Sequence, residues 1–224
     1  MSTRRSAGTG DLFGGIATPR GTIEPLAEGA VVLRGFVATE VPALLRDLQL
    51  VLAAAPFRHM VTPGGHTMSV AMTNCGEVGW VTDRTGYRYD AIDPETGRAW
   101  PAMPPLFLDV AARAAMAAGS PGFVPDGCLI NHYVPGARLT LHQDRNERDF
   151  AAPIVSVSLG LPAVFLFGGQ RRNDRPRRVR LESSDVVVWG GVSRLAFHGV
   201  DPLADGEDAL TGRCRINLTF RKAL

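Results

Sequence analysis

The chain has 224 residues, of which 45% are hydrophobic and 21% charged, a composition typical of a globular protein with one substantial core. Its net charge of +2 neither requires nor excludes a polyanionic partner. Three widely spaced cysteines, without a C-x-x-C pair or a secretory signal, predict free thiols in the cytoplasm, and no apolar run reaches the roughly 18 residues of a membrane span.

The N-terminal half combines a polar tail with two amphipathic helices. Residues 1–22 are rich in Gly, Ser, Thr and Arg and predict a flexible tail. Apolar spacing, a terminating Pro56 and a closing Gly119 predict the ends of the two helices. The elements expected here are a strand at Ala30–Gly35, a helix at Val41–Ala55 whose start Thr39 or Glu40 can cap, a strand at Thr67–Thr73 and a helix at Pro105–Ala118.

The turn-rich segment Met60–Pro104 contains two of the three tryptophans and two of the three tyrosines. Aromatic residues in such a segment either pack on the core or form a lid that stacks on a flat ligand such as a nucleobase. Stacking on a base contributes about 1–3 kcal/mol. Trp80 and Tyr87 are the residues that we expect to contact such a ligand.

From Asp126 onward, short strands alternate with Gly and Pro turns. Eight such strands predict a double-sheet jelly roll or barrel, with the helices covering one outer face. The expected strands are Gly127–Val134, Ala137–Gln143, Ile154–Leu161, Ala163–Phe167, Arg177–Glu182, Asp185–Trp189, Arg194–His198 and Arg213–Arg221. We therefore expect a single domain over residues 23–224.

His142 and Asp144 lie two residues apart in a run that alternates like a strand, so their side chains share one face. An imidazole and a carboxylate can hold adjacent positions on a divalent metal, and His198 is the candidate third ligand. Two histidines and one carboxylate form the facial triad of non-haem Fe(II) oxygenases. Taken singly, each also fits an ordinary role as a strand, turn or core residue.

The last expected strand places Arg215, Asn217 and Arg221 on one face and apolar residues on the other. Guanidinium groups bind carboxylates through two parallel hydrogen bonds, so this face predicts a site for an organic dianion. Asn131 and Tyr133 share a face of an earlier strand, and both can donate to the same carboxylate.

The segment Gln170–Arg180 carries six arginines and one acidic residue, Asp174, a local excess of five positive charges. Asn173 and Pro176 mark a turn, so the arginines are expected to project from the tip of a hairpin. Such a cluster is either a solvated loop or a surface that contacts phosphates in a salt-dependent way.

Motifs in a recognisable order run from about Ile23 to Arg221. They are Met60–Gly65, Met68–Cys75, Ala91–Pro94, Asn131–Gly136, His142–Asp144, Ser156–Gly160, Gly190–Gly191, His198–Gly199 and Arg215–Arg221. Together they resemble the bacterial AlkB family of Fe(II)- and 2-oxoglutarate-dependent dioxygenases, which repair alkylated nucleic acids.

The resemblance implies a mostly β protein with flanking helices. A double-stranded β-helix (jelly roll) core over residues 126–224 would follow helices and an N-terminal nucleotide-recognition lid over about residues 23–125. Fe(II) would be the metal, with 2-oxoglutarate and O2 as co-substrates. The implied residues are His142, Asp144 and His198 for iron and catalysis; Asn131, Tyr133, Arg215, Asn217 and Arg221 for 2-oxoglutarate; and Thr62, Met68, Trp80, Tyr87, Asn146 and Arg172 for substrate.

The implied activity is oxidative demethylation of bases such as 1-methyladenine and 3-methylcytosine in single- or double-stranded DNA, or in RNA, releasing formaldehyde, succinate and CO2. The enzyme would be a cytoplasmic monomer that must act on single strands or flip the base, because the methyl group lies on the Watson–Crick edge. Asn146 replaces an acidic residue of the family's best-known member and His132 a basic one, so the preferred base is open.

Two other functions fit parts of the pattern. A non-catalytic β-barrel would bind an anion through Arg215 and Arg221, but the intact set of His142, Asp144 and His198 argues against it. A 2-oxoglutarate oxygenase acting on a small molecule or a protein needs neither the arginine cluster nor the aromatic residues of the expected lid.

Overall fold

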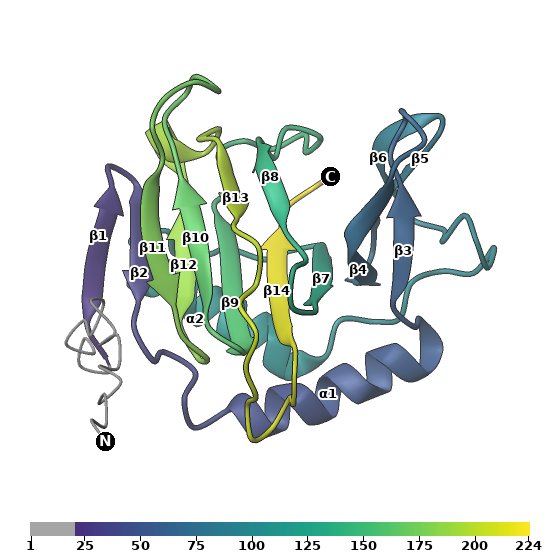
Figure 1. The fold of residues 1–224 in the computed structure, drawn as a ribbon, viewed down its shortest axis with the longest axis horizontal. Coiled ribbons are helices and arrows are strands. Elements are labelled where there is room, and N and C mark those ends of the chain that lie inside the picture. The colour runs from purple at the N-terminus through teal and green to yellow at the C-terminus, as the bar shows by residue number, and fades with distance from the viewer. Residues whose placement is uncertain (1–20) are drawn as a thin grey trace, which may run out of the picture.

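The computed structural model describes residues 21–224, so most of the predicted flexible tail, residues 1–22, lies outside the described residues. Within this range two antiparallel sheets face each other, and two helices lie against the outer side of the larger sheet (Figure 1). This arrangement is the predicted jelly-roll core. Neither helix in the described range has the length and apolar character needed to cross a bilayer.

Most strands belong to one of two sheets. The large sheet contains β1 (Ile23–Ala27), β2 (Ala30–Leu33), β3 (Arg58–Val61), β4 (Thr67–Gly76), β7 (Gly127–Tyr133), β9 (Ile154–Gly160), β12 (Val186–Trp189) and β14 (Arg215–Arg221). The smaller sheet contains β8 (Leu139–His142), β10 (Ala163–Phe167), β11 (Arg177–Leu181) and β13 (His198–Val200). The remaining elements are the hairpin β5 (Gly79–Asp83) and β6 (Gly86–Asp90), the helices α1 (Val41–Ala54) and α2 (Pro105–Ala117), and a 3₁₀ turn η1 (Gly191–Ser193).

The strand order is β1-β2-β12-β9-β14-β7-β4-β3 in the large sheet and β11-β10-β13-β8 in the smaller one. Strands from the N-terminal half therefore form both edges of the large sheet, while β9, β14 and β7 lie inside it. The hairpin β5–β6 stands beside β3 and β4 at one end of the molecule (Figure 1). The most central strands of the large sheet are thus those that carry the predicted co-substrate residues.

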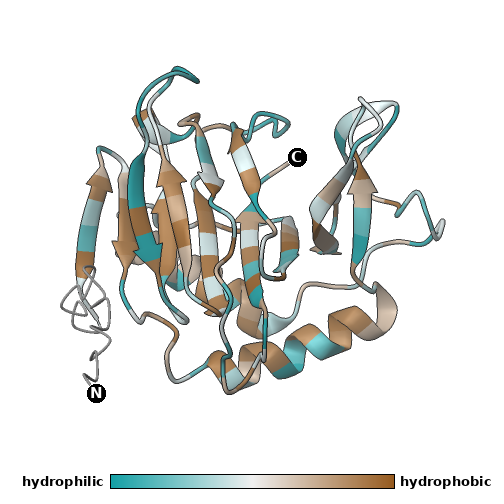
Figure 2. Ribbon diagram, viewed as in Figure 1, coloured by the Kyte–Doolittle hydropathy of each residue, from teal (hydrophilic) through white to brown (hydrophobic). Residues whose placement is uncertain are grey.

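Two apolar cores lie on opposite faces of the large sheet. The first fills the space between the sheets and includes Phe165 and Trp189. The second lies between the sheet and the helices and includes Leu48, Phe107 and Phe220, with the Phe107 and Phe220 rings meeting edge to face at 6.0 Å. Apolar residues alternate with polar ones along β14, whereas the loop between β10 and β11 is hydrophilic (Figure 2). The helices cover one outer face, as predicted.

All three cysteines are unpaired. Cys75 on β4 and Cys128 on β7 are register partners and are fully buried in the second core, between the large sheet and the helices. Burial raises the pKa of the Cys128 thiol well above its usual value, and a hydrogen bond with Cys75 adds to the effect. These two side chains therefore lie on the face of the sheet that is turned away from the space between the sheets.

The segment between the helices contains more strands than the sequence predicts. β4 extends three residues beyond Thr73, and β3, β5 and β6 were not predicted; neither was β1. In the hairpin, Trp80 pairs with Tyr89 and Thr82 with Tyr87, which places four residues on one face. These strands have four or five residues and are interrupted by Gly and charged residues, so their alternation is too short to stand out.

The strand predicted at Arg194–His198 is wrong. η1 is followed by Arg194, whose backbone N–H donates to Gly191 O at 3.0 Å, and the next strand, β13, begins at His198. The Arg194 side chain turns inward and donates to the carbonyl oxygens of Ala152 and Asp144. The segment turns instead of pairing as a strand, and the backbone N–H of Ala196 donates to Ser193 O at 2.9 Å.

The predicted side-chain cap of the first helix does not form. Glu40 occupies the N-cap position but makes no capping hydrogen bond. Its carboxylate instead pairs with Arg113 of α2, so it joins the two helices. The ends of both helices otherwise lie within one residue of the prediction.

Candidate active site

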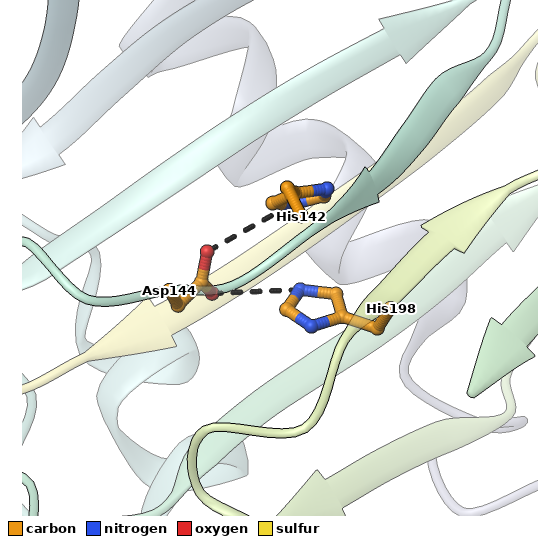
Figure 3. A group of neighbouring side chains, drawn as sticks. All are labelled: His142, Asp144 and His198. Carbon is orange, nitrogen blue, oxygen red and sulfur yellow. Dashed lines mark ion pairs between the residues drawn. The ribbon is translucent and has the colours of Figure 1, made fainter. Parts of the chain in front are cut away.

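The two predicted histidine ligands meet where β8 and β13 pair. His142 ends β8, His198 begins β13, and they are register partners whose rings lie 4.4 Å apart. Gly199 permits this approach, because a Cβ atom there would lie 2.7 Å from Leu139 O. Asp144 follows β8, with Oδ1 3.8 Å from Nε2 of His142 and Oδ2 3.7 Å from Nε2 of His198 (Figure 3).

The other ring nitrogen of each histidine faces a backbone carbonyl. Nδ1 of His142 lies 2.8 Å from Thr140 O, and Nδ1 of His198 lies 3.0 Å from Ala196 O. A carbonyl is an acceptor only, so each ring carries its proton on Nδ1 and leaves the Nε2 lone pair free. Such contacts orient metal-binding histidines in proteins.

The electrostatic surroundings keep these ligands ready for a cation. Burial and, next, the neighbouring His142 together lower the pKa of His198 to about 4, so the imidazole is neutral near pH 7. Burial would raise the pKa of Asp144, but Arg221 and then the two histidines hold it well below its usual value. Metal ligands must be deprotonated, and both groups meet this condition.

The donor set fits iron. One ligand atom from each of His142, Asp144 and His198 lies within 4.8 Å of the others, and no other such group of three occurs in residues 21–224. Two imidazoles and a carboxylate match the set that holds non-haem Fe(II) with open positions for co-substrate and oxygen.

The predicted co-substrate residues lie next to these ligands, on the central strands of the large sheet. Arg215 on β14 faces Tyr133 on β7, and Asn217 faces Asn131. These four residues and Arg221 line the same cavity of about 610 Å³ as the three candidate metal ligands. The alternation read from the sequence therefore places all five on the inner face of the sheet.

Arg215 is buried, yet two of its guanidinium nitrogens have no hydrogen-bond partner in the described range. Its side chain is buried, Nη2 donates to Ser158 Oγ at 3.0 Å, and the guanidinium lies 5.0 Å from the centre of the Tyr133 ring. Nε and Nη1 make no hydrogen bond to any residue in the described range. A buried guanidinium without an anionic partner is costly, so these donors fit an organic carboxylate that enters the cavity.

Arg221 is held differently. Its Nε and Nη2 donate to Oδ2 of Asp144 at 2.8 and 2.6 Å, and Nε lies 3.4 Å from Oε1 of Glu147. Nη1 is buried and makes no hydrogen bond within residues 21–224. One edge of this guanidinium therefore orients the candidate metal ligand, and Nη1 keeps an unused donor.

The predicted substrate residues line the outer part of the same cavity. They are Thr62, Met68, Trp80, Tyr87, Asn146 and Arg172. The rings of Trp80 and Tyr87 stack at 5.7 Å with an angle of 23° between their planes. Nε1 of Trp80 donates to Oδ1 of Asn146 at 3.4 Å, which joins the hairpin to the loop that follows Asp144.

The two remaining aromatic residues of the expected lid serve the core. Trp100 is buried and donates to Asp90 O at 2.9 Å, and the Tyr89 hydroxyl donates to Oε1 of Glu147 at 2.6 Å. The contacts of Trp100 and Tyr89 account for these two residues, and the base-stacking role of Trp80 and Tyr87 stays a prediction.

The arginine cluster is smaller than the sequence predicts. Arg177 pairs with Glu24, Arg178 with Asp201 and Arg180 with Glu182, which removes three of the six arginines from the free surface. Two of these acidic partners are distant in the sequence, so local charge counting could not reveal them. Arg171, Arg172 and Arg175 have no ion pair within residues 21–224.

Sequence reasoning missed several residues of the site. Ser156 and Ser158 on β9 contact Asn217 and Arg215, and their alternation in an apolar strand was a usable signal. Glu147 and Arg194 lie in irregular segments, where no periodicity indicates which side chains turn inward.

Comparisons with known proteins agree with this geometry. Residues 29–221 match the 2OG-Fe(II) oxygenase superfamily. The chain is 61% identical over 200 residues to the Alpha-ketoglutarate-dependent dioxygenase AlkB of Escherichia coli (strain K12), covering 89% of this chain and 93% of that protein. It is 41% identical over 113 residues, 46% of this chain, to the DNA N(6)-methyladenine demethylase ALKBH1C of Arabidopsis thaliana, of which it covers 25%.

A solved structure, that of OsALKBH1, superimposes with a TM-score of 0.77 at 30% identity, covering 90% of this chain and 100% of the other. Its fold supports the double-sheet core described above. The chain therefore belongs to the 2OG-Fe(II) oxygenase superfamily and, within it, to the bacterial AlkB family.

Proposed function

We propose that this chain is an Fe(II)- and 2-oxoglutarate-dependent dioxygenase that demethylates alkylated nucleobases, such as 1-methyladenine and 3-methylcytosine, in DNA or RNA. One observation carries the proposal. A single cavity is lined by three groups of residues. They are the histidines and the aspartate that match a set of iron ligands, two buried arginines with nitrogens that have no hydrogen-bond partner in the described range, and a stacked pair of aromatic rings. The names of the relatives, an AlkB dioxygenase and a DNA demethylase, support the same chemistry.

His142, Asp144 and His198 would hold the iron. When bound, the metal supplies oxygen activation, in which 2-oxoglutarate is converted to succinate and CO2 and the substrate methyl group leaves as formaldehyde. The carboxylates of 2-oxoglutarate would be bound by Arg215 and Arg221, which line the cavity and have guanidinium nitrogens without a hydrogen-bond partner in the described range.

Asn131, Tyr133 and Asn217 complete the co-substrate end of the cavity. Asn217 is fixed by donating to Ser156 Oγ at 2.8 Å and to Val157 O at 2.9 Å. Burial raises the pKa of Tyr133 to about 12, so its hydroxyl stays protonated and can donate to a carboxylate. These residues bind and orient the dianion, and the two sheets on either side of the cavity exclude bulk water.

The hairpin β5–β6 would stack the flipped base on Trp80 and Tyr87, with Thr62 and Met68 closing the pocket. Arg172 is placed to contact a phosphate of the strand. Asn146 offers an amide where a carboxylate would attract a cationic base. A cationic methylated base therefore gains less electrostatic stabilisation here than it would from an aspartate.

We also propose the organisation around this activity. Residues 23–224 form one catalytic domain, with helices and the nucleotide-recognition lid in about residues 23–125 and the jelly-roll core in residues 126–224. The enzyme acts as a monomer in the cytoplasm on single- or double-stranded nucleic acid.

The test uses protein reconstituted with Fe(II) under anaerobic conditions. An oligonucleotide carrying 3-methylcytosine is added with 2-oxoglutarate, the mixture is exposed to air, and methyl loss is followed by mass spectrometry. We expect loss that requires iron, 2-oxoglutarate and oxygen together. Consumption of 2-oxoglutarate without loss of the methyl group would contradict the proposed substrate while leaving the oxygenase chemistry in place.

A further inference from the structure

Glu147 lies in the loop after Asp144, and its side chain is only 1% exposed. It touches three separate parts of the chain. Oε1 accepts a hydrogen bond from the Tyr89 hydroxyl of β6 at 2.6 Å and lies 3.4 Å from Nε of Arg221 on β14. Oε2 lies 3.4 Å from Nη2 of Arg194, which follows η1. Glu147 therefore joins the lid hairpin, the large sheet and the segment leading to β13.

Asp144 contacts the same two arginines. Its carboxylate accepts from Arg221 at 2.6 Å, and its backbone carbonyl accepts from Nη1 of Arg194 at 2.9 Å. All four side chains are at most 9% exposed. Two carboxylates and two guanidinium groups thus form a buried cluster whose formal charges cancel. A divalent metal and a 2-oxoglutarate dianion also cancel, so loading both leaves the formal charge around this cluster unchanged.

We propose that Glu147 is a positioning residue that keeps Asp144 able to hold a cation. Without its charge, Arg221 and Arg194 would leave a buried excess of one positive charge beside the metal ligands. Charges in a buried site are poorly screened, so this excess opposes binding of a divalent metal but not of a dianion. The inference rests on the proposed iron and 2-oxoglutarate site.

Glu147 also fixes the lid. Tyr89 is the register partner of Trp80, so the hydrogen bond from Tyr89 to Glu147 holds the part of the hairpin that presents the Trp80 ring. Asn146, the preceding residue, contacts Trp80 itself. The loop that supplies the metal ligand Asp144 therefore also fixes the position of the hairpin β5–β6 over the cavity.

The first test measures Mn(II) binding by calorimetry without 2-oxoglutarate, in the wild-type protein and in Glu147→Gln. We expect the affinity for Mn(II) to fall about 10- to 100-fold in Glu147→Gln. This is the usual effect of removing a residue that supports the metal ligands without binding the metal itself. At saturating Mn(II), the affinity for 2-oxoglutarate should be unchanged or higher. Asp149→Asn is the matched control, because it removes one negative charge from the same loop outside the buried cluster.

The outcomes separate this inference from the proposed function. If the wild-type protein binds no Mn(II), the metal site and this inference fail together. If the wild type binds Mn(II) and Glu147→Gln binds it as well as Asp149→Asn does, only the role of Glu147 is refuted. Parallel losses of metal affinity, 2-oxoglutarate affinity and melting temperature would also refute it, since they would show a merely structural role.

The second test uses Tyr89→Phe, which keeps all four charges and removes only the link to the hairpin. Its Mn(II) affinity should match that of the wild type, while the loaded protein should bind a methylated oligonucleotide up to about tenfold more weakly. Because this variant leaves the charged cluster intact, it remains informative if Glu147→Gln does not fold. Unchanged oligonucleotide binding would refute the role in fixing the lid.

Discussion

The two ends of the cavity are built in different ways. At the metal end, the candidate ligands and the arginines of β14 lie between two sheets, and charged groups are bound to one another in the interior. At the lid end, Trp80 and Tyr87 belong to a two-stranded hairpin outside both sheets, and the Tyr87 side chain is 48% exposed. An isolated hairpin has little stability of its own, whereas the packed sheets hold their side chains firmly.

This contrast indicates a division of work. We expect chemistry that needs fixed geometry to use the central strands, and substrate selection to use the two-stranded hairpin. Substitutions at the metal end should therefore change metal or co-substrate binding and the free energy of unfolding together. Substitutions at the lid end should change only the binding of nucleic acid.

The largest effect is expected from Asp144→Ala. It removes a metal ligand, so Mn(II) binding and turnover should be lost. It also leaves Arg221 as a buried charge without its closest partner, which should lower the free energy of unfolding by about 3–5 kcal/mol. Calorimetry and urea denaturation measure the two effects.

A double variant separates them. Asp144→Ala combined with Arg221→Met removes both charges, so stability should largely recover while metal binding stays lost. Recovery of metal binding in the double variant would contradict the assignment of Asp144 as a ligand.

The next effect is expected from Arg215→Ala. Loss of two charge-assisted hydrogen bonds should raise the KM for 2-oxoglutarate about 100-fold or more, with Mn(II) affinity unchanged. Steady-state kinetics with 2-oxoglutarate varied provides the measurement. Arg213→Ala is the matched control, since Arg213 lies two residues earlier and pairs with Asp205 at the surface. Equal effects of the two substitutions would show that Arg215 has no special role.

At the lid end, Trp80→Ala should raise the KM for a methylated oligonucleotide about tenfold, because stacking on a base contributes roughly 1–3 kcal/mol. Metal affinity, 2-oxoglutarate affinity and melting temperature should stay close to wild type. A fall in metal affinity comparable to that of the metal-end variants would erase the distinction between the two ends.

The smallest effect is expected from the arginines of the β10–β11 hairpin. Arg172→Ala should lower the slope of log affinity against log salt by about 1 for an undamaged single strand. Arg178→Ala removes the same charge, but Arg178 already pairs with Asp201, so the slope should change less. Fluorescence anisotropy at several salt concentrations measures both. Equal slopes for the two variants would show that the ion pairs do not withdraw arginines from the nucleic-acid surface.

Residues in regular strands were predictable. The period of two in Arg215–Arg221 identified which side chains share a face, and the sheet then brought that face to the cavity. Asp144 lies beyond the end of β8, yet it lines the same cavity as His142. Pairing of His198 with His142 followed from the fold alone, because nothing local connects two segments 56 residues apart.

The rest of the site depends on contacts that no local pattern encodes. Glu147 lies in the irregular loop after β8, where no alternation shows which side chains turn inward. Arg194 lies in a segment that was predicted to be a strand. The ion pairs of Arg177 and Arg178 join residues that are distant in the chain. The hairpin β5–β6 was missed although Trp80, Val81 and Thr82 favour strands, because the segment offered too few residues for a period to show.

The position of the sulfur atoms has a consequence for chemical durability. An enzyme that handles oxygen risks oxidising its own side chains, and thiols are most vulnerable when ionised and accessible. Cys75 and Cys128 lie behind the large sheet, whereas Met68 and Met72 line the cavity. Oxidation during turnover should therefore affect the thioethers of Met68 and Met72, whose sulfoxides are reversible, and spare the thiols of Cys75 and Cys128, whose higher oxidation states are not.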